Sequence, residues 1–302
     1  MINRRALLRS LAAAGATSLF PRFAPAQSAP FLTRQIPSSG EQVPLVGLGS
    51  WITFNVGNDP VARNSCAEVM RAFFAGGGRM IDSSPMYGSS QDVIGYGLEK
   101  VDAVEKVFSA EKVWTRSGGA SQIESSRKKW RVARFDLIQV HNLLSWQEHL
   151  PTLLDMKAKG RVRYIGITTS EGRRHDEFER IMRTQPLDFI QVTYNAVERE
   201  SEKRLLPLAH ERGMAVIINR PFREGPLVRH AKRHPLPAWA AEFDCTNWAQ
   251  LLLKFIISHP AVTCAIPATT RADHVLENIG ASYGRLPDGA MRKRIIAQVE
   301  AL

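Results

Sequence analysis

Short apolar segments and helix-like segments alternate eight times along this chain, and this alternation constrains the fold more than any other feature. The apolar segments are near-continuous runs such as RYIGIT, LDFIQV, MAVIIN and VTCAIP, typical of parallel strands that are buried on both faces. Strands are expected at 44–49, 79–82, 107–113, 135–140, 162–168, 187–192, 214–218 and 262–266. Helices are expected at 60–74, 91–100, 121–130, 148–159, 176–183, 202–212, 248–258 and 273–281, with a long irregular connection over 219–244.

Eight such units close into a barrel more simply than they form an open sheet. A doubly wound dinucleotide fold is the weaker choice, because no GxGxxG motif follows the first strand, and LVGLGS is too short and lacks the third glycine. Residues 32–43 (LTRQIPSSGEQV) predict a small hairpin before the barrel. We therefore expect an α/β fold, a (β/α)8 TIM barrel with an N-terminal β-hairpin, as one domain over residues 31–302.

The first 26 residues have the organisation of an export signal. Residues 3–9 (NRRALLR) are basic, residues 10–20 form a modest apolar run, and Ala24, Pro25 and Ala26 give a small-x-small cleavage site. The apolar run is too short to span a bilayer. Paired arginines before a weak apolar run resemble the twin-arginine signals of bacteria, which export folded proteins. We expect a twin-arginine-type signal peptide over 1–26 and a periplasmic protein that meets the membrane only during export; an ordinary secretory signal or a disordered tail is the alternative.

Charge and cysteine content narrow the classes of partner. The formal charge is +11, of which four arginines in the first 26 residues supply +4 and leave +7 on the remainder. The basic residues are scattered and not interleaved with aromatic ones, so no nucleic-acid partner is expected, whereas a dinucleotide phosphate suits a moderate positive charge. Cys66, Cys245 and Cys264 lack zinc-ligand spacing, so no metal site is expected; buried side chains are favoured and a disulfide stays open.

Ionisable residues end three consecutive strands. The stretch RMIDSSPMYG, residues 79–88, places Asp82 at the end of a strand and Tyr87 in the following loop. The next two strands end at Lys112 and at His141. In a parallel barrel the carboxyl ends of the strands carry the chemistry, so these four side chains are candidates for an active site. The structural alternatives are a loop cap, a packed aromatic ring, a buried salt bridge and a core histidine.

The segments around these four residues resemble the catalytic tetrad of the aldo-keto reductases. They read IDSSPMYG, EKVFSAEKVW and FDLIQVHN, and the resemblance continues through GRVRYIGI, DFIQVTYN, NRPF and IPATTRADHVLENIGA in this order. It covers residues 31 to about 283. The resemblance implies an eight-stranded α/β barrel that binds NADP(H) in extended form across its top and reduces carbonyl compounds.

The chemistry of carbonyl reduction suits these four residue types. Hydride addition to a carbonyl builds charge on its oxygen, so a proton donor must stand within hydrogen-bond reach, and Tyr87 is the candidate. A phenol has a pKa of about 10, which a neighbouring cation lowers. Lys112 would supply that cation, and Asp82 would keep it charged in a poorly solvated pocket. His141 would hold the carbonyl oxygen or relay a proton.

The resemblance also implies a set of cofactor-binding positions. These are Thr168, Thr169, Gln191, Arg220, Thr269, Thr270, Arg271, His274, Glu277 and Asn278. Thr168, Thr169 and Gln191 match positions that hold the nicotinamide amide, although the family commonly has Ser-Asn where this chain has Thr-Thr. Arg220 would stack on the nicotinamide or pair with a pyrophosphate oxygen.

The end of the chain carries the expected adenosine side of that site. Residues 269–271 open the last expected helix of the barrel, where free backbone donors suit a phosphate, and Glu277 with Asn278 match the adenine-side pair. Ala268 stands where many family members carry a lysine for the 2′-phosphate, and His274 where an arginine is usual. Preference for NADP(H) therefore rests mainly on Arg271, and NAD(H) stays open as a cofactor.

Aromatic residues follow several of the expected strands. Trp51, Phe54, Trp114 and Trp146 would wall a substrate pocket above the nicotinamide, with ordinary loop packing as the alternative. The short loop after Lys112 and the short C-terminal segment indicate an open pocket, and the substrate is a small carbonyl compound whose identity is not predicted. We make no prediction of the oligomeric state.

Taken together, the residues predict an exported NAD(P)H-dependent oxidoreductase that reduces aldehydes or ketones, with Tyr87 as general acid. Two other functions stay open. One is a non-catalytic NADP(H)-binding sensor or accessory barrel. The other is a sugar oxidoreductase that recycles a tightly bound cofactor.

Overall fold

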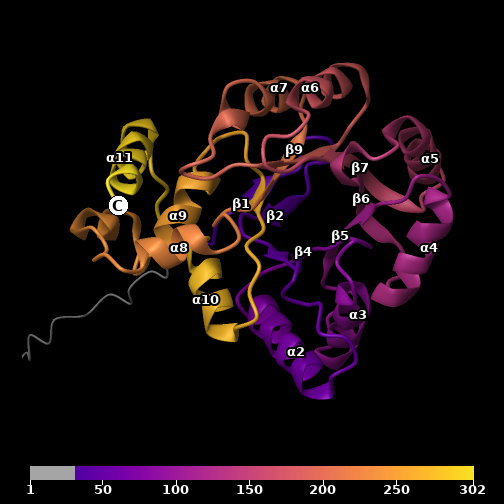
Figure 1. Ribbon diagram of the computed structural model, residues 1–302, viewed down its shortest axis with the longest axis horizontal. Coiled ribbons are helices and arrows are strands. Elements are labelled where there is room, and N and C mark those ends of the chain that lie inside the picture. The colour runs from indigo at the N-terminus through magenta and orange to yellow at the C-terminus, as the bar shows by residue number, and fades with distance from the viewer. Residues whose placement is uncertain (1–30) are drawn as a thin grey trace, which may run out of the picture.

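The computed structural model describes residues 31–302, so the expected signal peptide over 1–26 lies outside the described residues. Eight parallel strands stand at the centre of the described part, and helices surround them (Figure 1). Each strand pairs with the next one along the chain, in the order β10-β9-β8-β7-β6-β5-β4-β3. The expectation of a (β/α)8 barrel is confirmed.

The elements follow the expected alternation closely. The barrel strands are β3 Leu48–Gly49, β4 Met80–Asp82, β5 Phe108–Val113, β6 Phe135–Val140, β7 Val162–Thr168, β8 Phe189–Thr193, β9 Ala215–Asn219 and β10 Cys264–Ala265. The helices are α2 Pro60–Ala75, α3 Ser90–Lys100, α4 Gly119–Trp130, α5 Trp146–Ala158, α6 His175–Thr184, α7 Leu205–Glu211, α8 Pro226–Ala231, α9 Trp248–Ile257, α10 Ala272–Gly280 and α11 Gly289–Glu300. Short 3-10 helices are η1 His141–Leu143, η2 Glu200–Glu202 and η3 Ala238–Phe243.

The barrel closes between its first and last strands through single bridges rather than a long ladder. Val46 bridges Ala265 and Gly49 bridges Ala268, both in parallel. The backbone N–H of Gly49 donates to the carbonyl of Pro267 at 3.0 Å. A Cβ on Gly49 would lie 2.8 Å from the carbonyl oxygen of Ile266, so this seam needs a residue without a side chain.

The barrel interior has its own apolar core, separate from the layer between strands and helices. It is formed by Met80, Phe108, Ala110, Leu137, Tyr164, Phe189, Ala215, Ile217, Cys264 and Ile266 of the barrel, together with Ile36 and Val43. The last two belong to the expected hairpin, which is present as β1 Thr33–Gln35 paired with β2 Gln42–Pro44. The hairpin therefore seals one end of the barrel with its own apolar side chains.

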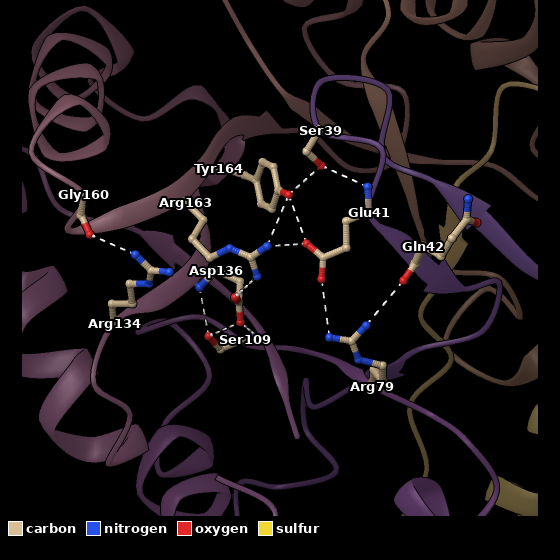
Figure 2. A network of polar contacts seen from close by, with 10 residues as sticks. All are labelled: Ser39, Glu41, Gln42, Arg79, Ser109, Arg134, Asp136, Gly160, Arg163 and Tyr164. Atoms are coloured by element: carbon tan, nitrogen blue, oxygen red, sulfur yellow. Dashed lines mark hydrogen bonds and ion pairs between the residues drawn. The ribbon is translucent and has the colours of Figure 1, made fainter. Parts of the chain in front are cut away.

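A polar network fixes the hairpin to the amino ends of the strands (Figure 2). Glu41 of the hairpin pairs with Arg163, and it also accepts a hydrogen bond from Tyr164 Oη at 3.0 Å. Arg163 donates to Asp136 Oδ1 at 2.6 Å, and Asp136 accepts from the backbone and hydroxyl of Ser109 at 2.7 and 3.0 Å. These residues lie at the starts of β5, β6 and β7, so this end of the barrel is closed and the opposite end is left for a site.

The connection over 219–244 is less irregular than expected. It contains α8, which begins with Pro226 after Gly225 in the left-handed region (φ 104°), and the short helix η3. Leu227 and Ala231 are the buried residues of α8. Two apolar positions on six residues give no period to recognise, which is why the sequence did not indicate this helix.

Residues 31–302 contain three cysteines, and the helices there can be compared with a membrane span. Cys66, Cys245 and Cys264 are each buried and free, so they form no disulfide with one another. Within this part of the chain, no helix combines the length and apolar character that a membrane crossing requires.

Candidate active site

A buried ion pair lies at the carboxyl ends of β4 and β5. Lys112 Nζ is 2.5 Å from Asp82 Oδ2 and donates to the carbonyl of Ser83 at 2.7 Å. The other carboxylate oxygen of Asp82 accepts a hydrogen bond from Gln191 Nε2 on β8 at 2.8 Å. Burial disfavours the Lys112 ammonium, but the acidic groups around it, with Asp82 first and then Tyr87 and Glu111, together outweigh burial and raise the pKa of Lys112 above its usual value. Lys112 is therefore a permanent buried cation.

Tyr87 lies in the loop after β4 and packs against that cation. Lys112 Nζ is 5.3 Å from the centroid of the Tyr87 ring. Burial raises the pKa of Tyr87 to about 12; Lys112 lowers it, as expected from the sequence, but does not overcome burial and the nearby carboxylates of Asp82 and Glu111. The phenol thus keeps its proton at neutral pH, which is the state that a proton donor requires.

His141 follows β6 and completes the group. Its ring stands edge-on to Tyr87, with centroids 5.7 Å apart and an interplanar angle of 88°. Nδ1 lies 2.7 Å from Ser84 Oγ. Burial, followed by the positive charges of Lys112 and Arg173, holds the pKa of His141 well below its usual value, so the imidazole is neutral. The structure therefore brings all four expected tetrad residues together at one end of the barrel.

A cavity of about 520 Å³ opens over this group and runs across the top of the barrel. Asp82, Tyr87 and His141 line it, while Lys112 is fully buried behind them. Most of the expected cofactor positions line the same cavity, namely Thr168, Gln191, Arg220, Thr269, Thr270, Arg271, His274, Glu277 and Asn278. The cavity therefore joins the tetrad to the first turns of α10.

Besides the buried Lys112, four of the expected site residues do not line this cavity. Phe54 is fully buried in the apolar layer outside the barrel, because the loop after β3 turns back at Ser50 and directs it inward. Trp114 is exposed, and Trp146 is turned away with its Nε1 donating to Glu177 at 2.9 Å. Thr169 is buried, and its hydroxyl donates to the Arg173 carbonyl at 2.6 Å. Of the expected aromatic wall only Trp51 lines the cavity.

Other lining residues carried no recognised signal in the sequence. They include Asn142, Glu171, Arg173, Asn219, Arg229 and Lys232. Ser84 does not line the cavity but bonds His141, and it lies in the motif that contains Asp82 and Tyr87. Its position in that motif could have identified it as part of the site. Asn219 ends β9, Asn142 lies in η1, Glu171 and Arg173 lie in the loop after β7, and Arg229 and Lys232 lie in and directly after α8. Outside the strands, no period marks the direction of a side chain.

The loops around the cavity hold an unusual backbone. Non-glycine residues with positive φ follow four strands: Ile52 after β3, Asn142 after β6, Glu171 after β7 and Arg220 after β9, with φ between 51° and 63°. Such conformations cost free energy and are retained where the surrounding structure fixes them, often at functional sites. These four residues follow the carboxyl ends of their strands, so they lie at the same end of the barrel as the tetrad.

Comparison with known proteins agrees with this geometry. A model of the aldo/keto reductase family matches residues 45–294. The chain belongs to the aldo/keto reductase family. Methylglyoxal reductase YeaE of Escherichia coli is 27% identical to this aldo/keto reductase over 81% of the chain and 88% of that protein. L-galactose dehydrogenase of Arabidopsis thaliana is 23% identical over 89% of the chain and 93% of that protein.

Solved structures of aldo-keto reductases share the fold. One from Klebsiella pneumoniae, in complex with NADP and acetate, superposes with a TM-score of 0.71 at 23% identity and covers 87% of this chain and 92% of its own. The holo form of one from Bacillus halodurans gives a TM-score of 0.72 at 19% identity, over 89% of this chain and 96% of its own.

The cavity of this aldo/keto reductase suits a dinucleotide. Arg220 lines it, and its Nη1 pairs with Glu171 at 2.8 Å and with Glu224. Arg220 Nε is buried and has no hydrogen-bond partner among residues 31–302. A buried donor without a partner costs free energy, so an anionic group placed here would be stabilised. The side-chain amides of Gln191 and Asn219 lie on the same path between Arg220 and the tetrad, and they offer polar groups to a nicotinamide amide.

Proposed function

We propose that this protein is an NADP(H)-dependent carbonyl reductase that converts aldehydes or ketones to alcohols. The observation that carries the proposal is the convergence of a protonated phenol, a buried ammonium and a neutral imidazole on one cavity. Tyr87 and His141 line this cavity, and Lys112 is buried behind them. The reductase and dehydrogenase names of the related proteins support the same class of reaction.

The residues divide the proton chemistry among them. When bound, the reduced nicotinamide would supply a hydride to the carbonyl carbon of the substrate. Tyr87 gives its proton to the carbonyl oxygen as charge develops there. Lys112 stabilises the phenolate that remains, and Asp82 holds Lys112 in place. His141, neutral and oriented by Ser84, donates a hydrogen bond to the same oxygen.

We infer that NADP(H) is the preferred cofactor from the charges at the α10 end of the cavity. Arg229, Lys232, Arg271 and His274 line this end. Arg271 is exposed and pairs with Asp273 at 2.5 Å, and Lys232 pairs with Glu277 at 3.2 Å. Arg229 has no carboxylate partner among residues 31–302, so it adds an unbalanced positive charge that favours a 2′-phosphate.

Oxidation of NADPH, followed by its absorbance with a panel of aldehydes and quinones, tests the function. Wild type should turn over, and Tyr87→Phe should abolish turnover while leaving the NADPH dissociation constant unchanged. Tyr96→Phe is the matched control, because Tyr96 bonds Asn64 on the outer surface and does not line the cavity.

Three other outcomes would contradict the proposal or the role of Tyr87 in it. Tight NADPH binding without turnover of any carbonyl compound identifies a sensor or accessory barrel. Conversion of a sugar without net change in the cofactor identifies an oxidoreductase that recycles a bound cofactor. A Tyr87→Phe variant that keeps most of its rate removes Tyr87 from the role of acid.

We also propose that the protein is exported in folded form by the twin-arginine route. The support is the sequence NRRALLR followed by a weak apolar run and the segment Ala24-Pro25-Ala26. Export after folding would let the barrel carry its cofactor into the periplasm. Protein purified from the periplasm should therefore contain nicotinamide cofactor, and an active preparation without any would argue against this.

A fusion of residues 1–30 to a reporter that works only when folded before export tests the route. The fusion should reach the periplasm, and replacing Arg4 and Arg5 by lysine should retain it in the cytoplasm. Export that is unaffected by the two substitutions would contradict the proposal of the twin-arginine route.

A further inference from the structure

The strand that carries Lys112 also carries a buried acid for which the chemistry described above has no use. Glu111 precedes Lys112 on β5, and successive side chains of a strand point to opposite faces. Lys112 therefore points toward Asp82, and Glu111 points outward to the helices α3 and α4. The Glu111 side chain is fully buried there, with no exposed surface.

Neutral donors alone satisfy the Glu111 carboxylate. Oε2 accepts from Trp130 Nε1 of α4 at 2.6 Å and from Gln91 Nε2 of α3 at 3.0 Å, and Oε1 accepts from the backbone N–H of Lys112 at 2.7 Å. No lysine or arginine side chain among residues 31–302 forms an ion pair with it. The two hydrogen bonds on Oε2 join α3 and α4 to β5, and a neutral glutamine side chain could accept both without the cost of a buried charge. These hydrogen bonds therefore explain a polar side chain at this position but not an ionisable one.

The environment of Glu111 makes its charge sensitive to pH. Burial raises the pKa of Glu111 to about 7, although Lys112 and the three donors oppose this. In the poorly solvated interior a change of charge is felt over several ångströms. The Glu111 carboxylate raises the pKa of Tyr87 and that of Lys112, so its ionisation reaches the proton donor.

No other ionisable group faces Glu111 from the elements packed around it. α3 presents Gln91, and α4 presents Ser126 and Trp130, all uncharged. The charged residues of these helices, none of them buried, are Asp92, Glu99, Lys100, Glu124, Arg127, Lys128 and Lys129. On the neighbouring strands, Asp82 of β4 lies on the Lys112 side, and Asp136 of β6 belongs to the hairpin network at the other end of the barrel.

We propose that Glu111 is a positioning residue for the reduction, acting through Lys112: the charge of its buried carboxyl on the outer face of β5 controls how readily Tyr87, packed on the Lys112 ammonium at the inner face, gives up its proton. The inference rests on the proposed function. Carbonyl reduction should therefore slow by several-fold as pH rises through neutrality, and alcohol oxidation should not slow over the same step. The acid on the outer face of β5 thus changes the rate of the reduction with pH, while the reactants alone fix the equilibrium.

The first experiment compares pH profiles of kcat for NADPH-dependent reduction by wild type and Glu111→Gln. Wild type should show an inflexion near pH 7, and Glu111→Gln should lack it and exceed wild type on the alkaline side. Glu124→Gln is the matched control: it removes the same charge from the exposed face of α4 and should keep the inflexion. An inflexion that survives in Glu111→Gln overturns the proposal.

A second readout needs neither cofactor nor turnover. In protein labelled with 13C at tyrosine Cζ, the Tyr87 resonance, identified by its loss in Tyr87→Phe, should shift with pH around 7 in wild type and stay constant in Glu111→Gln. A protein that reduces no carbonyl compound but shows this shift refutes the function and keeps the coupling. A Tyr87 resonance that does not respond in wild type refutes the coupling itself.

Discussion

Ser84 Oγ lies 2.7 Å from Nδ1 of His141, although the two residues are 57 positions apart in the chain. The same hydroxyl oxygen accepts the backbone N–H of Met86 at 3.2 Å, so its hydrogen is free to be donated to Nδ1. With Nδ1 as acceptor, the imidazole proton is on Nε2, which can then donate to a carbonyl oxygen. Ser84 thereby orients the residue that the sequence assigned to holding the substrate.

Removing this hydroxyl should weaken the reaction without unfolding the protein. Ser84→Ala is expected to lower kcat/KM by about tenfold, equivalent to about 1.4 kcal/mol of transition-state stabilisation. The imidazole 15N shifts should show loss of the single tautomer. Ser83→Ala is the control, because Ser83 is also buried but its hydroxyl has no hydrogen-bond partner in the described part of the chain. Equal losses in both variants would refute the role of Ser84.

The buried pair of Asp82 and Lys112 should be strongly coupled in stability. Lys112→Met leaves the Asp82 carboxylate without its cation, and we expect a loss of about 3–5 kcal/mol in the free energy of unfolding. Asp82→Asn in the Lys112→Met background should recover part of this loss, because no uncompensated charge remains. Denaturant unfolding of the single and double variants measures the coupling; additive losses would contradict it.

Glu111 should make the stability of the protein fall as pH rises. Its pKa is about 7 when folded against about 4.5 when unfolded, so the folded protein binds this proton more tightly. The stabilisation is fully present below the unfolded value and is lost as pH rises through about 7, and it amounts to roughly 3 kcal/mol. Between pH values of about 4.5 and about 7, the free energy of unfolding should fall more steeply with pH in wild type than in Glu111→Gln. Parallel curves for the two proteins would falsify the assignment.

Arg271 should discriminate between the two cofactors. Arg271→Ala is expected to raise the dissociation constant of NADPH by about tenfold, the loss of roughly 1.4 kcal/mol from a charge-assisted contact, and to leave that of NADH unchanged. Arg183→Ala removes an equally exposed arginine from α6, away from the cavity, and should change neither constant. If Arg271→Ala binds both cofactors as wild type does, the preference must come from Arg229, Lys232 or His274.

Two tryptophans at the mouth of the barrel should behave differently. Trp51 lines the cavity and Trp114 does not, although both are exposed to a similar extent. Trp51→Ala should raise KM for bulky carbonyl substrates by several-fold, because an apolar wall is lost. Trp114→Ala should leave KM unchanged. Steady-state kinetics with one small and one large aldehyde distinguish the two, and a matching rise in KM for Trp114→Ala would contradict the described cavity.

The sequence determined the architecture and the identity of the reacting groups. Apolar runs of strand length between helix-like segments predict a parallel barrel, because only strands buried on both faces need such runs. Asp82, Lys112 and His141 end consecutive strands and Tyr87 follows in a loop, and parallel strands bring their carboxyl ends to one rim. Their meeting therefore follows from chain order alone.

Tertiary structure decided everything that depends on the direction of a side chain in a loop or on contacts between distant segments. Phe54 and Trp51 are three residues apart in one loop, yet one enters the core and the other lines the cavity. Glu111 reads as an ordinary acid beside Lys112 until α3 and α4 bury it, which is what moves its pKa to about 7. The burial of a side chain and the electrostatic potential at it depend on every residue packed around it. Most of these residues are distant in the chain, so the local sequence does not reveal them.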